Sequence, residues 1–165
     1  MEIYKLDASQ WREYKELRLE ALREDAEAFG MSYAEALSLL DEEWQDEFEN
    51  RKGFILVASE DSKLLAMIGA YQEEGEKMKH IAYVWGVYVR KEHRGKGIGK
   101  MLMESLLEEL AKNKELEKVD LNVNTSQLSA VRLYEKLGFK IAGTLHSELK
   151  IGTKYYDEHV MEKFL

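Results

Sequence analysis

The chain of 165 residues contains no cysteine and no proline, and it has no long apolar run. Without cysteine it has no means of forming a disulfide bond, a zinc–thiolate site or a cysteine nucleophile. No stretch approaches the roughly 20 apolar residues that cross a bilayer. The residues Met1–Lys5 also lack the basic and then apolar pattern of a signal peptide. These absences predict a cytoplasmic protein that needs neither a membrane nor a metal ion.

Basic charge is also in short supply, since 32 acidic side chains outnumber 24 basic ones and the formal net charge is −8. General nucleic-acid binding requires a basic face, so nucleic acid is not an expected partner. We expect the acidity to serve solubility, with attraction of a cationic substrate such as an amine as the alternative. The length and the hydrophobic share of 45% are ordinary for one globular domain, which we expect to cover residues 1–165.

The pattern of apolar residues and turn residues predicts an α/β fold with one mixed sheet. A strand, a helix and a second strand follow one another over residues 81–123, and that order requires a parallel pair joined by a right-handed crossover. The remaining neighbours are expected as antiparallel hairpins, with turns at Asp61–Ser62 and around Gly152. The expected order is β-α-α-β-β-β-α-β-α-β-β, with about seven strands flanked by four to five helices.

The strand His80–Val89 is apolar on both faces, which predicts a covered position at the centre of the sheet. The other strands are expected over Glu2–Leu6, Phe54–Ser59, Leu64–Gln72, Lys118–Val123, Lys140–Lys150 and Lys154–Phe164. The helices are expected from Asp7 or Ser9 toward Gly30, over 32–40, 42–51 and Ile98–Leu110, and over Ala130–Leu137 with Gly138 as its C-terminal cap.

The segment Arg94-Gly-Lys-Gly-Ile-Gly99 lies between the central strand and the next helix. Glycines let the backbone approach an anion closely, and the N–H groups and dipole of a helix N-terminus favour negative charge. The segment therefore predicts a phosphate-binding loop. It does not match a P-loop, because Met101 stands where a hydroxyl side chain would hold magnesium. It matches a dinucleotide loop only weakly, because the spacing is G-x-G-x-G and Asp120 falls inside an expected strand.

Two segments together resemble a known family. Arg94-x-x-Gly97-x-Gly99 resembles the acyl-CoA pyrophosphate loop of the GNAT superfamily of N-acetyltransferases. The segment Gln127-Leu-Ser-Ala-Val-Arg-Leu-Tyr-Glu-Lys-Leu-Gly-Phe139 resembles a later helix of the same superfamily, and the two motifs occur in the family's order. The resemblance covers residues 80–145 and implies a GNAT-like mixed sheet with acetyl-CoA as the acyl-donor co-substrate.

The resemblance implies transfer of the acetyl group to a primary amine by direct attack in a ternary complex. The absence of cysteine agrees with a mechanism that has no covalent enzyme intermediate. A protein N-terminal acetyltransferase is one alternative, and a non-catalytic acyl-CoA-binding sensor is another. The sequence leaves the acceptor amine and the oligomeric state open, although homodimers are common in the family.

The resemblance also implies roles for individual residues. The backbone at the end of the central strand pairs with the pantetheine arm, and an N–H near Val87 polarises the thioester carbonyl. Gln127 stands where the family often has asparagine, and its amide can make the same bonds. The residues implied to bind the cofactor are Val87, Tyr88, Val89, Arg94, Gly95, Lys96, Gly97, Ile98, Gly99, Lys100 and Gln127.

Tyr134 is the expected catalytic residue, as the donor of a proton to the departing CoA thiolate. Helical spacing alone favours a core tyrosine, so this role depends on the resemblance. Some ribosomal-protein N-acetyltransferases of the superfamily have a glutamate base at the position of Asn122, and an amide cannot take a proton. The candidates that remain for the proton acceptor are Glu73, Glu74, His80 and a water chain. The acidic residues expected at the surface, with contact to a cationic amine as the alternative, are Glu24, Asp25 and Glu27.

Overall fold

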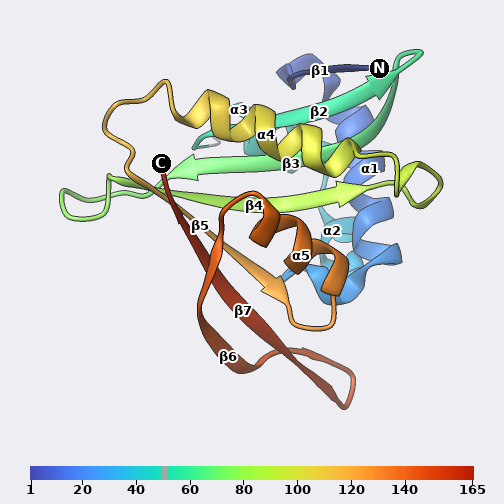
Figure 1. Cartoon of the computed structure of the whole chain (residues 1–165). Helices are drawn as coiled ribbons and strands as arrows, with labels where there is room; N and C mark the ends of the chain where they lie inside the picture. The colour runs from blue at the N-terminus through green and yellow to red at the C-terminus, as the bar shows by residue number, and fades with distance from the viewer. Residues whose placement is uncertain (50–51) are drawn as a thin grey trace.

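The computed structural model describes residues 1–49 and 52–165 (Figure 1). Its strands are β1 (Glu2–Lys5), β2 (Phe54–Glu60), β3 (Lys63–Gln72), β4 (Ile81–Val89), β5 (Lys118–Asn124), β6 (Lys140–Ile151) and β7 (Lys154–Phe164). Its α-helices are α1 (Trp11–Glu24), α2 (Tyr33–Ser38), α3 (Asp41–Glu49), α4 (Ile98–Leu110) and α5 (Leu128–Lys136). Short 3₁₀ turns are η1 (Ala8–Gln10), η2 (Ala26–Ala28) and η3 (Lys91–His93).

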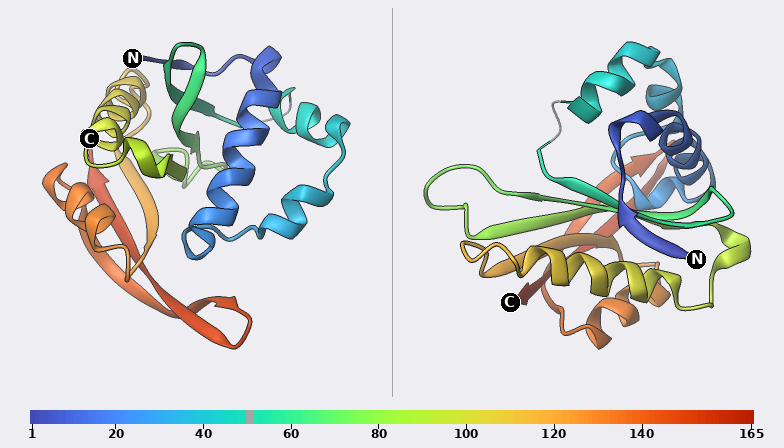
Figure 2. Two further views of the ribbon diagram at one scale, coloured as in Figure 1. Left: turned by 90° about the vertical axis from the view of Figure 1, so that its right-hand side faces the viewer. Right: turned by 90° about the horizontal axis from the view of Figure 1, so that it is seen from above.

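The strands form one seven-stranded sheet in the order β1-β2-β3-β4-β5-β7-β6. β4 and β5 are parallel, and the other neighbouring pairs are antiparallel. The right-hand view of Figure 2 shows the sheet between two helical layers, with α1–α3 on one face and α4 and α5 on the other. The predicted mixed α/β sheet with β4 at its centre is thereby confirmed.

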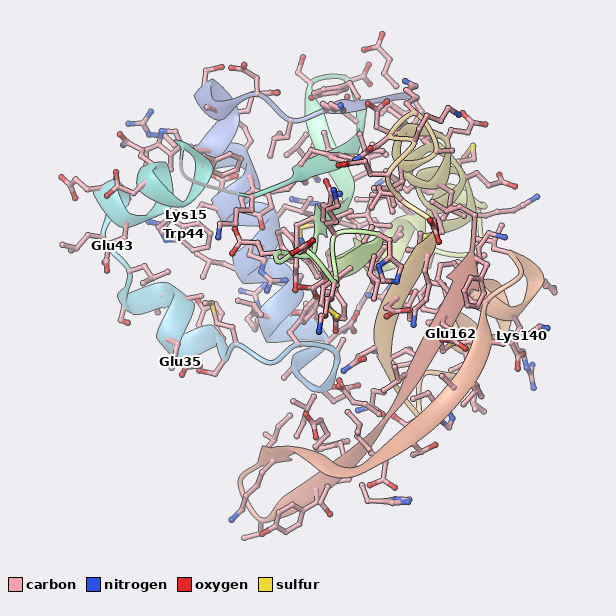
Figure 3. All side chains as sticks on the ribbon, turned by 90° about the vertical axis from the view of Figure 1, so that its left-hand side faces the viewer. Lys15, Glu35, Glu43, Trp44, Lys140 and Glu162 are labelled. Carbon is pink, nitrogen blue, oxygen red and sulfur yellow. The ribbon has the colours of Figure 1, made fainter. Side chains whose placement is uncertain are left out.

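Each helical layer has its own apolar core. Tyr14 and Leu17 of α1 are buried against one face of the sheet, and Leu102 and Leu106 of α4 are buried against the other. Complete burial of one such leucine contributes about 1.5–3 kcal/mol. In the outer part of the α1 layer, the Lys15 ammonium lies 5.8 Å from the ring centroid of Trp44 on α3 (Figure 3). The two cores fix both faces of β4, which carries the residues of the site.

Several helix ends differ from the prediction. α1 ends at Glu24, well before Gly30, because Asp25 leaves the helical region with a φ of −130°. Three helices precede β2, in agreement with the separate ranges expected over 32–40 and 42–51, although the expected element order counts only two; the extended Leu39 separates α2 from α3. The helix expected over 42–51 begins at Asp41 and is described as far as Glu49. The last two residues of that expectation lie outside the described part of the chain.

Strand ends and turns follow the prediction closely. β4 begins at Ile81 and not at His80, whose carbonyl instead accepts hydrogen bonds from the N–H groups of Glu117 and Lys118 (2.8 and 3.1 Å). The β2–β3 turn consists of Asp61–Ser62, both with positive φ angles (48° and 64°). A two-residue turn of this kind suits the twist of a hairpin.

The end of β4 carries a bulge. Toward β3, Trp85 pairs with Gly69 and Tyr88 pairs with Met67, so β4 has one residue more than β3 between these pairs. Gly86 takes the left-handed conformation that such a bulge favours, with a φ of 67°. A Cβ on Gly69 would lie 2.3 Å from the Trp85 ring, so glycine is needed where that ring crosses β3.

β4 and β5 separate just before the bulge. Their pairing covers Ile81–Val84 against Lys118–Leu121, and Figure 1 shows β5 diverging from β4 beyond that point. The edge of β4 that faces β5 is therefore left without a ladder partner over Trp85–Val89 in the described pairing. An extended ligand can add to such an edge as another strand would.

The β6–β7 hairpin projects past the helical layers (Figure 2). Most of β6 is exposed to solvent along its length. Lys140 and Glu162 are register partners at the base of the hairpin, where Figure 3 places them side by side. β7 lies between β6 and β5 and pairs with both in antiparallel register.

Candidate functional site

The glycine loop before α4 forms an open backbone turn. Gly95 and Gly97 adopt positive φ angles of 75° and 81°, and a Cβ on either would meet nothing within 4 Å. Gly97 is the N-cap of α4, and the first intrahelical bond is donated by the Met101 N–H to its carbonyl (3.0 Å). The N–H groups of Ile98–Lys100 therefore have no acceptor within the helix. The arrangement can bind an anion at the positive end of the helix dipole.

The basic side chains of this loop are placed in two ways. Lys96 and Lys100 are exposed at the mouth of the loop. The Arg94 side chain turns back, donating from Nε to the Val89 carbonyl (2.8 Å) and from Nη2 to Asp25 at the end of α1 (2.5 Å). Arg94 thus ties the loop to the α1 layer. Contact of these three side chains with phosphate stays a prediction.

The acidic residues after α1 are engaged with the same loop region. The Glu24 carboxylate lies 2.6 Å from the Lys91 ammonium, and Asp25 is paired with Arg94. The pKa of Glu24 is lowered by its hydrogen bonds with Lys91 and Arg23. Among the described residues, these carboxylates serve to hold η3 and the glycine loop against α1.

The unpaired edge of β4 leads directly into the glycine loop. Val87 and Val89 pack toward the core under α4, while Tyr88 is buried on the opposite face. The Tyr88 hydroxyl donates to Glu20 of α1 (3.1 Å). Burial and the charge of Glu20 raise the pKa of Tyr88, so its phenol stays neutral. The side chains anchor the strand from both faces, and the main-chain edge that faces β5 has no ladder pairs beyond Val84 with any described residue.

Tyr134 of α5 is buried in the core on the α4 side of the sheet. Its side chain is only 4% exposed, and its ring centroid lies 6.0 Å from that of Phe139. Burial raises the pKa of Tyr134, which keeps the phenol protonated at neutral pH. A Cβ on Gly99 would lie 3.6 Å from Val89 and 3.7 Å from Leu133, so α5 packs close to both the start of α4 and the end of β4.

Gln127 is the N-cap residue of α5, and its side chain makes no capping hydrogen bond. The turn before it is organised by the buried Asn124. The Asn124 side-chain oxygen accepts from the N–H and hydroxyl of Ser126 (2.9 and 2.7 Å), and its amide donates to the Glu27 carbonyl of η2 (3.0 Å). Asn124 thus joins β5, α5 and η2, and contact between Gln127 and CoA stays a prediction.

The residues named as candidate proton acceptors lie at the other end of the sheet. Glu73 and Glu74 line a cavity of about 690 Å³ beside the C-terminal end of α4, and Glu74 is paired there with Lys52 (2.5 Å). His80 precedes Val87 by seven residues. Because a strand rises about 3.3 Å per residue, that separation is about 23 Å. His80 is therefore too far from Val87 to act there directly, and a water chain stays open as a prediction.

The structure places a different carboxylate beside Asn122. The Asn122 amide donates to Oε2 of Glu158 on β7 (3.2 Å), and Glu158 is 9% exposed. Burial raises the pKa of Glu158 above its ordinary range, although the bond from Asn122 opposes that shift. Sequence reasoning missed Glu158 because nothing local indicates the register of β5 against β7.

No helix in the described part of the chain is both long and apolar enough to cross a membrane. The described residues also contain no group of three or more His, Asp or Glu side chains placed to hold a metal ion.

β4 separates from its parallel neighbour β5 and leads into the open, glycine-rich N-terminus of α4. This arrangement is typical of a protein that can bind an extended ligand with a phosphate group. The model of the Acetyltransferase (GNAT) family matches residues 6–139. The chain therefore belongs to the GNAT acetyltransferase family, as the two motifs predicted.

Individual relatives agree with that assignment. The chain is 32% identical over 82 residues to a probable spermine N(1)-acetyltransferase of Bacillus subtilis subsp. natto, a match that covers 48% of this chain and 53% of that protein. The chain thus spans about half the length of this curated relative.

Solved structures show the same fold. The structure of a GNAT-family acetyltransferase from Streptococcus pneumoniae superposes with a TM-score of 0.89 at 21% identity, covering 99% of each chain. A putative acetyltransferase from Salmonella typhimurium, determined with its cofactor acetyl-CoA, superposes with a TM-score of 0.79 at 18% identity. That match covers 99% of this chain and 93% of the other.

Proposed function

We propose that this chain forms one N-acetyltransferase domain that transfers the acetyl group of acetyl-CoA to a primary amine. The observation that carries the proposal is the continuity between the unpaired edge of β4 and the open N-terminus of α4. Acetyl transfer to amines is the general reaction of the family, and a structural neighbour was determined with acetyl-CoA.

The binding part of the proposal uses the main chain. The N–H groups of Ile98–Lys100 bind the diphosphate, and the glycines leave room for it. The pantetheine arm adds to β4 over Trp85–Val89, which places the thioester near the bulge at Gly86. Lys96 and Lys100 add positive charge at the exposed rim.

The chemical part of the proposal is direct attack. The neutral amine attacks the thioester carbonyl while both reactants are held together, which supplies much of the rate. The N–H of Val87 stabilises the negative charge that develops on the carbonyl oxygen. Tyr134, kept neutral by burial, protonates the sulfur as the carbon–sulfur bond breaks, and it regains a proton that the attacking nitrogen loses.

Release of free thiol tests the activity directly. The purified chain has no cysteine, so any new thiol in a mixture with acetyl-CoA comes from the co-substrate. We expect thiol release with at least one amine from a panel of polyamines, amino acids, aminoglycosides and peptides with a free N-terminus. Polyamines come first because the Bacillus relative is named for spermine. Binding of acetyl-CoA without thiol release across the panel would contradict transferase activity and favour a sensor.

A further inference from the structure

Glu158 stands out among the described residues because it is the one charged side chain in the buried set. Its partner is an amide, since Oε2 accepts from Asn122 at 3.2 Å. Transfer of a carboxylate out of water is unfavourable unless a cation or several donors compensate it. A single hydrogen bond from the neutral Asn122 amide offsets only part of the cost of burying the charged Glu158 carboxylate.

Two other carboxylates on the same face of the sheet are each paired with a cation, which allows a comparison. Lys118 lies 3.2 Å from Asp120 and 3.0 Å from Glu162, so both of those carboxylates have a cation. Glu158 and Glu162 are four residues apart on β7, and both side chains project to the face that carries α1–α3. No described cation pairs with Glu158. The ionisable groups that interact with Glu158 are Tyr83 of β4 and Glu148 of β6. The guanidinium of Arg18 on α1 lies farther along β4, where a Cβ on Gly86 would be 3.8 Å from its Nη1.

Glu158 is level with the reacting end of β4. It is the register partner of Asn124, three residues beyond the last β5 pair at Leu121. Val87 is likewise three residues beyond the last β4 pair at Val84. Glu158 and Tyr83 interact electrostatically across β5: burial raises the pKa of Tyr83 to about 12, and the charge of Glu158 adds to that rise.

We propose that Glu158 binds the ammonium group of the acceptor on the α1–α3 side of β4, β5 and β7, and that it takes the proton which frees the amine for attack. This inference rests on the proposed function and names the acceptor as a primary amine that binds in its charged form. Asn122 is a positioning residue that holds the Glu158 carboxylate. In this proposal Glu158 on β7 provides the carboxylate that some members of the superfamily have at the position of Asn122 on β5.

The proton balance follows from this placement. The ammonium nitrogen has three protons and the amide product keeps one. Glu158 accepts the first proton, directly or through one water, and passes it to solvent. The nitrogen then forms its bond to the acetyl carbon as the carbon–sulfur bond breaks. The second proton reaches the sulfur through Tyr134, so the products are the N-acetyl amine, CoA thiol and one proton in solution.

Glu158→Gln tests the proposal, with Glu162→Gln as the matched control on the same strand and face. We expect Glu158→Gln to lower kcat/KM for the best amine of the panel by about 10²–10⁴, the range for loss of a general base. The Kd for acetyl-CoA, measured by calorimetry, should stay unchanged, and the acidic limb of the pH profile of kcat/KM should disappear. Glu162→Gln should retain both the activity and the limb.

Asn122→Leu provides a second measurement that does not remove the carboxylate. The hydrogen bond from Asn122 favours the charged form of Glu158, so its loss raises the pKa of that carboxyl. We expect the acidic limb to move to higher pH. The position of the acidic limb in Asn122→Leu still tests the proposal if the Glu158→Gln variant does not fold.

Three results would overturn the inference: equal activity of the two glutamine variants, a parallel loss of acetyl-CoA binding in Glu158→Gln, or an unmoved acidic limb in Asn122→Leu. Failure of the proposed function looks different. In that case the wild-type chain releases no thiol with any amine, whatever residue stands at position 158.

Discussion

The role proposed for Tyr134 depends on the burial of its side chain. A tyrosine at its position in a packed helix is ordinary, and the family motif alone indicates a proton donor. Burial raises the pKa of Tyr134, so the phenol stays protonated at the pH of the assay. The protonated phenol is the form that a departing thiolate requires.

Tyr134→Phe should therefore lower kcat by about 10²-fold or more, since it removes the donor and retains the ring. The Kd for acetyl-CoA should stay within about twofold, because no main-chain donor is altered. Steady-state thiol release and calorimetry measure the two quantities. Tyr155→Phe, at an exposed position on β7, is the control that should change neither. An equal loss of turnover and affinity in Tyr134→Phe would mean that the ring is only structural.

Glu158 also predicts an effect on stability. Its pKa is raised in the folded chain, so its contribution to stability is fully present below the ordinary glutamate pKa of about 4.3 and is lost as the pH rises through the raised value. Glu158→Gln keeps the hydrogen-bonding oxygen without the charge. The variant should have a higher Tm than the wild type at pH 8, and the difference should vanish near pH 4. A wild-type advantage at pH 8 would contradict an uncompensated carboxylate.

Among the elements, the start of α4 depends on backbone conformation more than on side chains. Gly97 and Gly152 both adopt positive φ angles, 81° and 60°, and both have open space at the Cβ position. Alanine at either position should destabilise the fold by about 1–2 kcal/mol through backbone strain alone. Only Gly97→Ala should also weaken acetyl-CoA binding, by about tenfold, because a displaced turn misdirects the amides of α4.

Chemical denaturation and calorimetry on both alanine variants separate these two effects. Gly152→Ala is the control, because it imposes the same strain in the β6–β7 turn. Equal acetyl-CoA affinity in the two variants would place the diphosphate away from the start of α4.

The elements that sequence predicted well are those with a local signal. The glycine loop, the periodic face of α4 and the hairpin turn at Asp61–Ser62 all appear where expected. The pairing of Arg94 with Asp25 was not predictable, because the two residues are 69 apart and meet only when α1 packs on the sheet. Glu158 was missed for the same reason, since the β5–β7 register arises from long-range pairing.

At the scale of the whole molecule, ligand binding should appear as added stability. Acetyl-CoA at a hundred times its Kd should stabilise the folded chain by about 2.7 kcal/mol. For a chain of this size that corresponds to a rise in Tm of about 5–11 °C. NAD and ATP at the same concentration should leave the Tm unchanged. A rise with either nucleotide and none with acetyl-CoA, measured by calorimetric melting, would contradict the proposed site.

The position of Trp85 over Gly69 has a practical consequence for fluorescence measurements. Of the three tryptophans in the chain, Trp11 and Trp44 are 6% and 1% exposed, deep in the layer of α1–α3. The indole of Trp85 is only half-buried, crosses β3 above Gly69 and adjoins the bulge. Its emission should consequently respond when substrates arrive, so that intrinsic fluorescence of an unlabelled sample can follow binding in real time.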